Sequence, residues 1–389
     1  LKDLGINQIQ CMPVYEFEEA GVRVNYWGYG PGYYFAPKSA YAKDGDGVKG
    51  LKDLVKYCRK AGIEVVLEMP FAEGISGLMV TDCLRNYVME YHVDGFILNP
   101  YNVPMDIILK DPILTGVRIL KHAEEYQNVM RRFLKGDEGV VTDVMYQTRK
   151  RWDLEGIYNC ITTHTGFTLK DLVSYDGKHN EANGESNQDG PDYNYSWNCG
   201  AEGETDDPNV NGLRRRLIKN AFAALLCSRG PAMFFAGDEF CNTQFGNNNA
   251  YCQDNIISWL DWSRLEEFKE IHDFVRHMIQ FRKEHPILRK MTKPSSCQFP
   301  EISVHNGTPF NASTDYKTKL IGIMYAGRNE EDTEDDIVFY CMNAYWEPLV
   351  MQLPVLPNGK HWHVDTTPMQ SMLTERTSRK RQSFWVSTP

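Results

Sequence analysis

Hydrophobic positions in the first three quarters of the chain follow two alternating periods. Apolar runs of strand length occur at residues 6–14, 63–69, 93–98, 117–120, 157–163 and 232–236. Helix-period stretches lie between or after them, at residues 48–58, 84–91, 217–226 and 268–279. The first carries Leu51, Val55 and Cys58 on one face and stops at Gly62. Buried strands that alternate with amphipathic helices predict a parallel sheet covered by helices. Repetition of this unit within about 250 residues favours a (β/α)8-type TIM barrel over the alternative, an open doubly wound sheet.

The pattern changes near residue 290. Short β-type runs at 320–325, 337–340, 350–353 and 361–364 are separated by charged or proline- and glycine-bearing turns, which is typical of an antiparallel β domain. We therefore expect a barrel domain over 1–290 and a β domain over 291–389. Because the chain begins at Leu1, without a methionine and in an apparent helix end, we also expect an N-terminal segment to precede it.

Composition excludes some classes of partner. The formal net charge of −10 over 389 residues argues against nucleic acid or an anionic membrane as the main partner. The ten cysteines are scattered singly, without metal-ligand spacing, and read as free thiols of a reducing, cytoplasmic compartment. No calcium-type spacing occurs either, so the sequence predicts neither a metal nor another cofactor.

The segment Ile157–Asp189 carries the most informative polar side chains. An apolar run ends in Thr162, Thr163, His164 and Thr165, and a loop rich in Asn, Glu and Gly follows. Side chains that follow the carboxyl end of a barrel strand are typical of an active-site edge.

Three stretches resemble the glycogen-debranching and isoamylase branch of glycoside hydrolase family 13. They are HTGFTLKDLVSYDGKHNEANGE within 164–185, NYWGYGPGYYFAP at 25–37, and AGDEFCNTQFGNNNAYCQDNIISWLDW at 236–262. The resemblance implies a β/α barrel followed by an antiparallel β-sandwich. It also implies that the first barrel strand lies before Leu1, and that the long excursion after strand three of that family is largely deleted here.

The resemblance places the catalytic positions on residues that are not acids. Retaining glycosidases use two carboxyl groups about 5–5.5 Å apart, and this family adds a third acid. By the resemblance, the nucleophile position is Asn99, the acid/base position is His122 and the third position is Thr165. An active enzyme would therefore need recruited carboxylates, for which the candidates are Glu68, Glu73 and Asp106.

Several positions that contact sugar in the family are retained. By the resemblance they are Tyr29, with the neighbouring Trp27, and His164, His179 and Asn180. Each has a structural alternative, because Tyr29 can pack on Trp27 and the others can hold the barrel rim together. Asp238 and Glu239 are interpreted as a buried polar corner rather than as catalysts.

Three functions follow from these observations and stay open. The first is a catalytically inactive homologue that binds α-glucan (glycogen or starch) or regulates an active debranching enzyme. The second is an active α-1,6-glucosidase, and the third is a protein-interaction scaffold without sugar binding.

Overall fold

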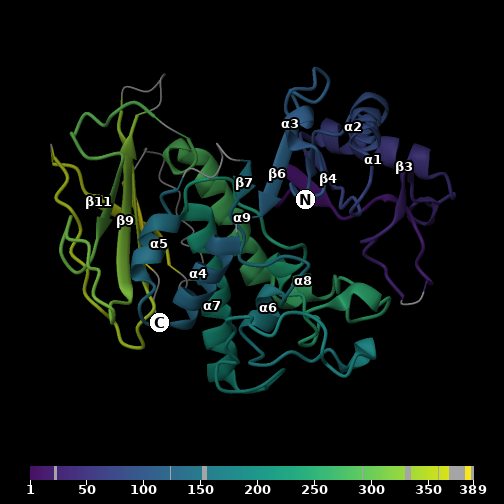
Figure 1. Ribbon diagram of the computed structural model, residues 1–389. Helices are drawn as coiled ribbons and strands as arrows, with labels where there is room; N and C mark the ends of the chain where they lie inside the picture. Colours follow the sequence, from purple (N-terminus) through teal and green to yellow (C-terminus); the bar gives the residue numbers. More distant parts are fainter. Residues whose placement is uncertain are drawn as a thin grey trace. The chain divides into compact units, whose positions relative to one another are not determined.

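The computed structural model describes residues 1–21, 24–122, 124–150, 156–290, 292–328, 334–357, 359–367 and 382–386. They divide into two compact units, Leu1–His122 with Ala250–Asn255, and Ala123–Asn249 with Ile256–Pro389 (Figure 1). This division reflects packing and does not test the domain boundary expected at residue 290, which stays a prediction.

Four parallel strands form the sheet of the first unit. In spatial order they are β1 (Gln8–Cys11), β4 (Glu64–Glu68), β5 (Gly95–Ile97) and β6 (Arg118–His122). The predicted apolar runs form these strands because their side chains are buried: Val65, Val66, Leu67 and Phe96 are all 0% exposed.

Strands β5 and β6 approach closely at Gly95. A Cβ atom at this position would lie 2.7 Å from the carbonyl oxygen of Arg118 and 3.2 Å from Cγ2 of Val66. Only glycine therefore fits at the start of β5 without moving a neighbouring strand.

The helices of the first unit begin and end where local chemistry directs them. Helix α1 (Gly47–Ala61) is capped by Asp46, whose side chain accepts from the Lys49 N–H at 3.0 Å. It ends at Gly62 with φ 75°, as the sequence predicts. The predicted second helix is also confirmed, as α2 (Gly77–Asn86) continued by a π-helical turn, η2 (Tyr87–Tyr91). Shorter helical segments are η1 (Ser39–Tyr41), α3 (Met105–Ile108) and η6 (Ala250–Cys252).

A two-stranded antiparallel sheet supports the aromatic loop at 25–30. It pairs β2 (Tyr15–Phe17) with β3 (Gly32–Pro37). The Tyr15 hydroxyl donates to the Gly28 carbonyl at 2.8 Å, and Gly28 has φ 79° with the Phe17 ring against it. A Cβ at position 28 would lie 2.6 Å from that ring, so this turn requires glycine.

Helices dominate the first part of the second unit. They are α4 (Glu124–Lys135), α5 (Val141–Gln147), α6 (Leu169–Leu172), α7 (Pro208–Cys227), α8 (Arg264–Glu267) and α9 (Lys269–Glu284), with short 3-10 turns η4 (Glu181–Asn183), η5 (Asp238–Phe240) and η7 (Pro286–Leu288). The helices predicted around residues 217–226 and 268–279 are thus confirmed as α7 and α9. Arg282 of α9 is buried and donates to the Leu226 and Ser228 carbonyls at 2.6 and 2.9 Å, which satisfies acceptors at the end of α7.

The parallel strands form an open half-barrel sheet, which is part of the (β/α)8-type barrel expected from the sequence. Among the described residues, β1 has only β4 as a strand neighbour, so the sheet is open at that edge. The run predicted at 157–163 forms only the two-residue strand β7 (Ile157–Tyr158), and the run at 232–236 only a bridge between Asn159 and Ala232. The second run turns early because the Phe235 N–H bonds the Asp238 carboxylate at 3.3 Å instead of a neighbouring strand.

The C-terminal region forms one mixed sheet within the described residues, not the expected β-sandwich. Its order is β11 (Trp362–Thr366), β12 (Gln382–Val386), β10 (Asp336–Asn343), β9 (Leu320–Gly327) and β8 (Ile302–His305). Strands β8, β9 and β10 are antiparallel, whereas β12 is parallel to both of its neighbours. The strand predicted at 350–353 is wrong: Pro348 and Pro354 flank it, and prolines lack the N–H that a ladder needs.

All ten cysteines lie in the described part of the chain and are free thiols. No helix among the described residues has the length and apolar character needed to cross a bilayer.

Candidate functional site

A buried carboxyl group lies at the strand ends of the first unit. Glu68 is the last residue of β4 and is 8% exposed. The Tyr29 hydroxyl donates to its Oε1 at 2.6 Å, while Oε2 is buried and has no hydrogen-bond partner among the described atoms. Burial raises the pKa of Glu68, and the Tyr29 hydrogen bond partly opposes this. Glu68 is therefore a carboxyl group with an increased tendency to hold a proton.

Aromatic rings surround this pair. The Trp27 ring meets the rings of Tyr29 and Tyr251 edge-on, with centroids 6.1 and 6.3 Å apart. Asn25 fixes the loop, because its side chain accepts from the Trp27 N–H at 2.9 Å and donates to the Tyr29 carbonyl at 2.8 Å. Packing of Tyr29 on Trp27 is thus present, and both rings keep partly exposed surface that a sugar ring can contact.

The expected nucleophile position carries an exposed amide. Asn99 follows β5, and its Oδ1 accepts from the Tyr101 N–H at 3.1 Å, so the side chain stabilises a turn. The expected acid/base position, His122, ends β6, and its side chain lies outside the described residues. Thr165 is exposed, and its backbone bonds the Thr163 hydroxyl.

Two of the three candidate recruited carboxylates face solvent. Glu73 lies exposed in the connection after β4, and Asp106 is exposed in the first turn of α3, where it suits the helix N-terminus. Of the three, only Glu68 is buried.

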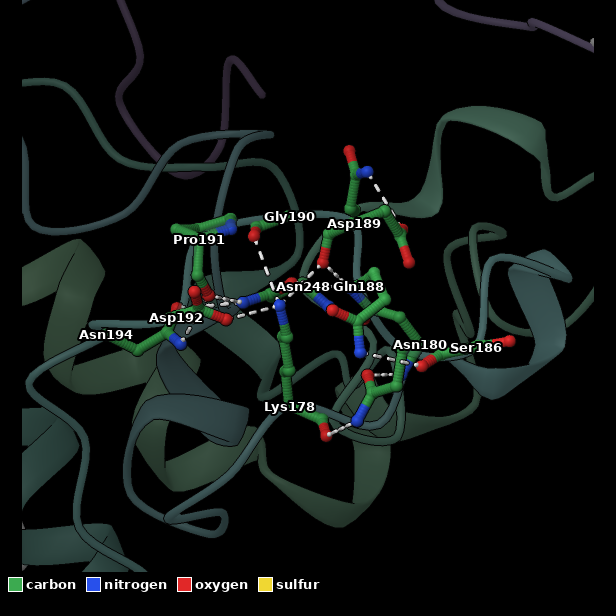
Figure 2. A network of polar contacts seen from close by, with 12 residues as sticks. Lys178, Asn180, Ser186, Gln188, Asp189, Gly190, Pro191, Asp192, Asn194 and Asn248 are labelled. Carbon is green, nitrogen blue, oxygen red and sulfur yellow. Dashed lines mark hydrogen bonds and ion pairs between the residues drawn. The ribbon is translucent and has the colours of Figure 1, made fainter.

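Figure 2 shows the polar network of the loop 178–192 in the second unit. Asn180 is 0% exposed, and its Nδ2 donates to the Asp189 carbonyl at 2.9 Å and to Asn248 Oδ1 at 2.8 Å. Its Oδ1 accepts from the Asn248 N–H at 2.9 Å. Lys178 bonds the Asp189 and Gly190 carbonyls at 2.9 and 3.3 Å. Asn180 was expected to contact sugar, and in this structure the polar atoms of its side chain are hydrogen-bonded to Asp189 and Asn248.

Two histidines of this unit, His164 and His179, were expected to contact sugar, and both are at least partly exposed. The His179 ring packs edge-on against Tyr175 at 5.3 Å, and its Nε2 lies 3.2 Å from Glu202 Oε1. Its side chain is 44% exposed, so a ligand can reach it. His164 is half-buried directly before Thr165.

Buried carboxylates hold the polar corner of the second unit. Asp238 is 1% exposed and accepts from the Thr162 hydroxyl, from the Leu169 N–H at 2.8 Å and from the Phe235 N–H. Burial raises the pKa of Asp238 to about 7, against the opposing effect of these hydrogen bonds. The corner is thus structural.

Sequence reasoning missed a second buried acid. Asp171 is 0% exposed and accepts from the Thr243 hydroxyl and from the Gln244 N–H at 2.8 Å, and burial raises its pKa to about 6. The sequence contains one signal for Asp171, the Thr-x-x-Asp spacing from Thr168 that is typical of a helix start. In the structure Thr168 caps α6 and its side chain accepts from the Asp171 N–H.

Comparison with known proteins identifies the relatives of this chain. No protein-family model matches it. The protein "Isoamylase 3, chloroplastic" of Oryza sativa subsp. japonica is 34% identical over 477 positions, which cover 94% of this chain and 59% of that protein. The "Glycogen operon protein GlgX homolog" of Mycobacterium tuberculosis (strain ATCC 25618 / H37Rv) is 31% identical and covers 75% of this chain and 54% of that protein.

This chain spans less than two thirds of the length of these curated relatives. The rice alignment of 477 positions is also longer than the 389-residue chain, so segments of the relative have no counterpart here. This difference in length agrees with the deletion expected after strand three. The position of that deletion stays a prediction.

Solved structures share the fold. A pullulanase from Paenibacillus barengoltzii in complex with maltohexaose and alpha-cyclodextrin has a TM-score of 0.66 at 18% identity, over 91% of this chain and 65% of that chain. A pullulanase from Bacillus acidopullulyticus has a TM-score of 0.65 at 20% identity, over 87% and 49%. The sequence similarities and this shared architecture together show that the chain belongs to the isoamylase and GlgX family of glycoside hydrolase family 13.

Proposed function

We propose that this chain is a non-catalytic α-glucan-binding member of its family. The observation that carries the proposal is the pair of strand-end positions Asn99 and Thr165, which present an exposed amide and an exposed hydroxyl where the family resemblance requires acids. In a retaining glycosidase, one carboxylate attacks the sugar and forms a covalent glycosyl-enzyme bond, which water later breaks. Negative charge at the site also stabilises the oxocarbenium-like transition state. An amide or a hydroxyl group supplies neither.

Support for glucan binding comes from the aromatic loop of the first unit. Trp27 and Tyr29 present partly exposed rings, and the Tyr29 hydroxyl is fixed by Glu68. Rigid rings with a polar edge are suited to the apolar face and hydroxyl rim of a glucose unit. The pullulanase from Paenibacillus barengoltzii, which shares the fold, was solved in complex with maltohexaose and alpha-cyclodextrin. A role in regulating an active debranching enzyme would extend this proposal to a partner protein.

Calorimetry with maltoheptaose tests the binding function. We expect the chain to bind this oligosaccharide and Trp27→Ala to weaken binding about tenfold, because an aromatic contact contributes roughly 0.5–1.5 kcal/mol and 1.4 kcal/mol is a factor of ten. Tyr101→Ala is the matched control, since Tyr101 is 94% exposed in the same unit and should leave the affinity unchanged. Absence of binding by the unmodified chain would favour the interaction scaffold instead.

Restoring a single acid tests the missing chemistry. Asn99→Asp is expected to give no hydrolysis of glycogen or of a maltosyl-branched substrate, because Thr165 still supplies no charge and no acid/base partner is restored. The measurement is release of reducing ends, with an inactive preparation as the background. Hydrolysis by this single variant would contradict the assignment of His122 and Thr165 to the other two positions.

One observation favours a second candidate, an active α-1,6-glucosidase. Glu68 is buried, burial raises its pKa, and Oε2 has no partner among the described atoms, which are properties of a general acid. In that case the unmodified chain hydrolyses an α-1,6-linked substrate and Glu68→Gln removes the activity. A chain without hydrolysis above background leaves Glu68 as the partner of Tyr29.

A further inference from the structure

A cavity of about 620 Å³ lies within the second unit, and none of the residues assigned above to catalysis or to sugar contact lines it. The end of α4, one face of α7 and the turn that follows β10 line it. Its volume is in the range of about 300–1,000 Å³ that is usual for small-molecule sites.

Helix α7 supplies one wall. Leu213, Arg216, Leu217 and Asn220 follow the i, i+3, i+4, i+7 spacing of a single helix face. Arg216 is half-buried, and its Nε is buried without a hydrogen-bond partner among the described residues. A guanidinium group has five N–H donors, four of them on its terminal nitrogens, so an acceptor that enters the cavity can bond these terminal groups while protein atoms cover Nε.

The turn after β10 supplies aromatic surface. Asn343 Oδ1 accepts from the Tyr345 N–H at 3.0 Å, and Asn343 Nδ2 donates to the Glu347 carbonyl at 2.9 Å, which fixes the turn. The rings of Tyr345 and Trp346 lie 5.5 Å apart, and Trp346 is 73% exposed. Across the lining, Trp197 is 37% exposed. Such rings stack on flat ligands.

The charged residues of the lining are all cations. They are Arg216, Lys319 and Lys135, and the Lys135 amine lies 3.4 Å from an Asp137 carboxylate outside the lining. No aspartate or glutamate is among the lining residues, although the chain carries a net charge of −10. Arg216 and Lys319 therefore make the cavity complementary to an anion.

We propose that this cavity binds a phosphate monoester carried on a ring, either a sugar phosphate or a nucleotide. The phosphate oxygens accept from Arg216 and Lys319, since a guanidinium fork matches phosphate geometry. The ring stacks on Trp346, the more exposed of the two tryptophans that line the cavity. The site goes beyond the glucan-binding function and does not depend on it, because none of its residues belongs to the aromatic loop at 25–30.

Calorimetry on the full chain, at physiological ionic strength, distinguishes the two sources of the phosphate. Glucose 6-phosphate and AMP are the two arms, with inorganic phosphate, glucose and adenosine as probes of the separate parts. We expect at least one monoester to bind ten times more tightly than either of its parts. Quenching of tryptophan fluorescence should accompany binding, since two tryptophans line the cavity.

Substitutions locate the site. Arg216→Gln and Trp346→Ala are each expected to weaken binding of the monoester at least tenfold. Arg215→Gln is the matched control, because Arg215 is the next residue of α7 but pairs with Glu270 at 2.6 Å and does not line this cavity. Trp346 is so exposed that its removal should leave the fold intact, which circular dichroism checks.

Three results would overturn the proposal. The first is that neither monoester binds. The second is that glucose or adenosine binds as tightly as its phosphate ester, and the third is that Arg215→Gln weakens binding as much as Arg216→Gln. Maltoheptaose affinity, measured on the same Arg216→Gln variant, should stay unchanged, so failure here leaves the glucan proposal standing.

Discussion

Replacing Asp238 by alanine is expected to lower the free energy of unfolding by about 2–4 kcal/mol. The carboxylate accepts from the Leu169 and Phe235 N–H groups and from the Thr162 hydroxyl, so its removal leaves buried donors without acceptors. Each such group costs about 1–3 kcal/mol, partly offset because the buried charge is itself costly. Urea denaturation measures the change. Asp206→Ala is the control, because Asp206 is exposed in the same unit and should shift stability by less than about 0.5 kcal/mol.

The pH dependence of unfolding gives the same variant a second readout. Asp238 in the folded chain holds its proton up to about pH 7, whereas an unfolded aspartate releases it near pH 4. Between these values the folded state binds more protons, so the free energy of unfolding falls as the pH rises. In Asp238→Ala this contribution disappears, and the slope that remains includes that of Asp171. A slope between pH 5 and 8 that matches the unmodified chain would contradict the raised pKa.

Asn180→Ala is expected to cost about 2–3 kcal/mol and to loosen the loop 178–192. The side chain makes three hydrogen bonds inside the loop network, and their loss leaves the Asn248 N–H and the Asp189 carbonyl without these partners (Figure 2). Thermal unfolding measures the stability, and limited proteolysis measures the exposure of the loop.

Gln188→Ala is the matched control for this loop. Gln188 is exposed, and its amide makes one long hydrogen bond of 3.4 Å to the Ser186 carbonyl, so little should change. Equal protease sensitivity of the two variants would mean that Asn180 does not hold the loop.

Hydrophobic periodicity predicted the parallel strands and the main helices because burial on both faces of a sheet leaves a direct record in the sequence. The stop of α1 at Gly62 was readable for a similar reason, since a left-handed residue favours glycine. The ends of the strands could not be predicted from the sequence. The run at 232–236 is apolar enough for a strand, but the Asp238 carboxylate takes the Phe235 N–H, which periodicity does not record. Beyond residue 290, the apolar run at 350–353 does not form a strand, because Pro348 and Pro354 flank it and lack the N–H groups that a strand ladder needs.

The candidate site was predictable by residue type but not by environment. Sequence indicated Tyr29 and Glu68 separately, and the structure joins them by a 2.6 Å hydrogen bond between distant segments of the chain. The family resemblance indicated Asn180 either as a sugar contact or as a residue that holds the rim together, and the structure shows its buried amide hydrogen-bonded to Asp189 and Asn248. Burial depends on long-range packing, so a polar residue in one sequence cannot reveal whether solvent or protein satisfies it.

The close approach of the strands at Gly95 makes the start of β5 much less tolerant of substitution than the residues that follow the strand. A methyl group at its start would collide with the neighbouring strand, so drift there is closed to every other amino acid. Four residues later, Asn99 faces solvent, and a side chain that keeps an oxygen acceptor for the Tyr101 N–H can replace it without disturbing the strand. Aspartate is such a side chain, so position 99 can be varied by directed evolution while the sheet is left unchanged.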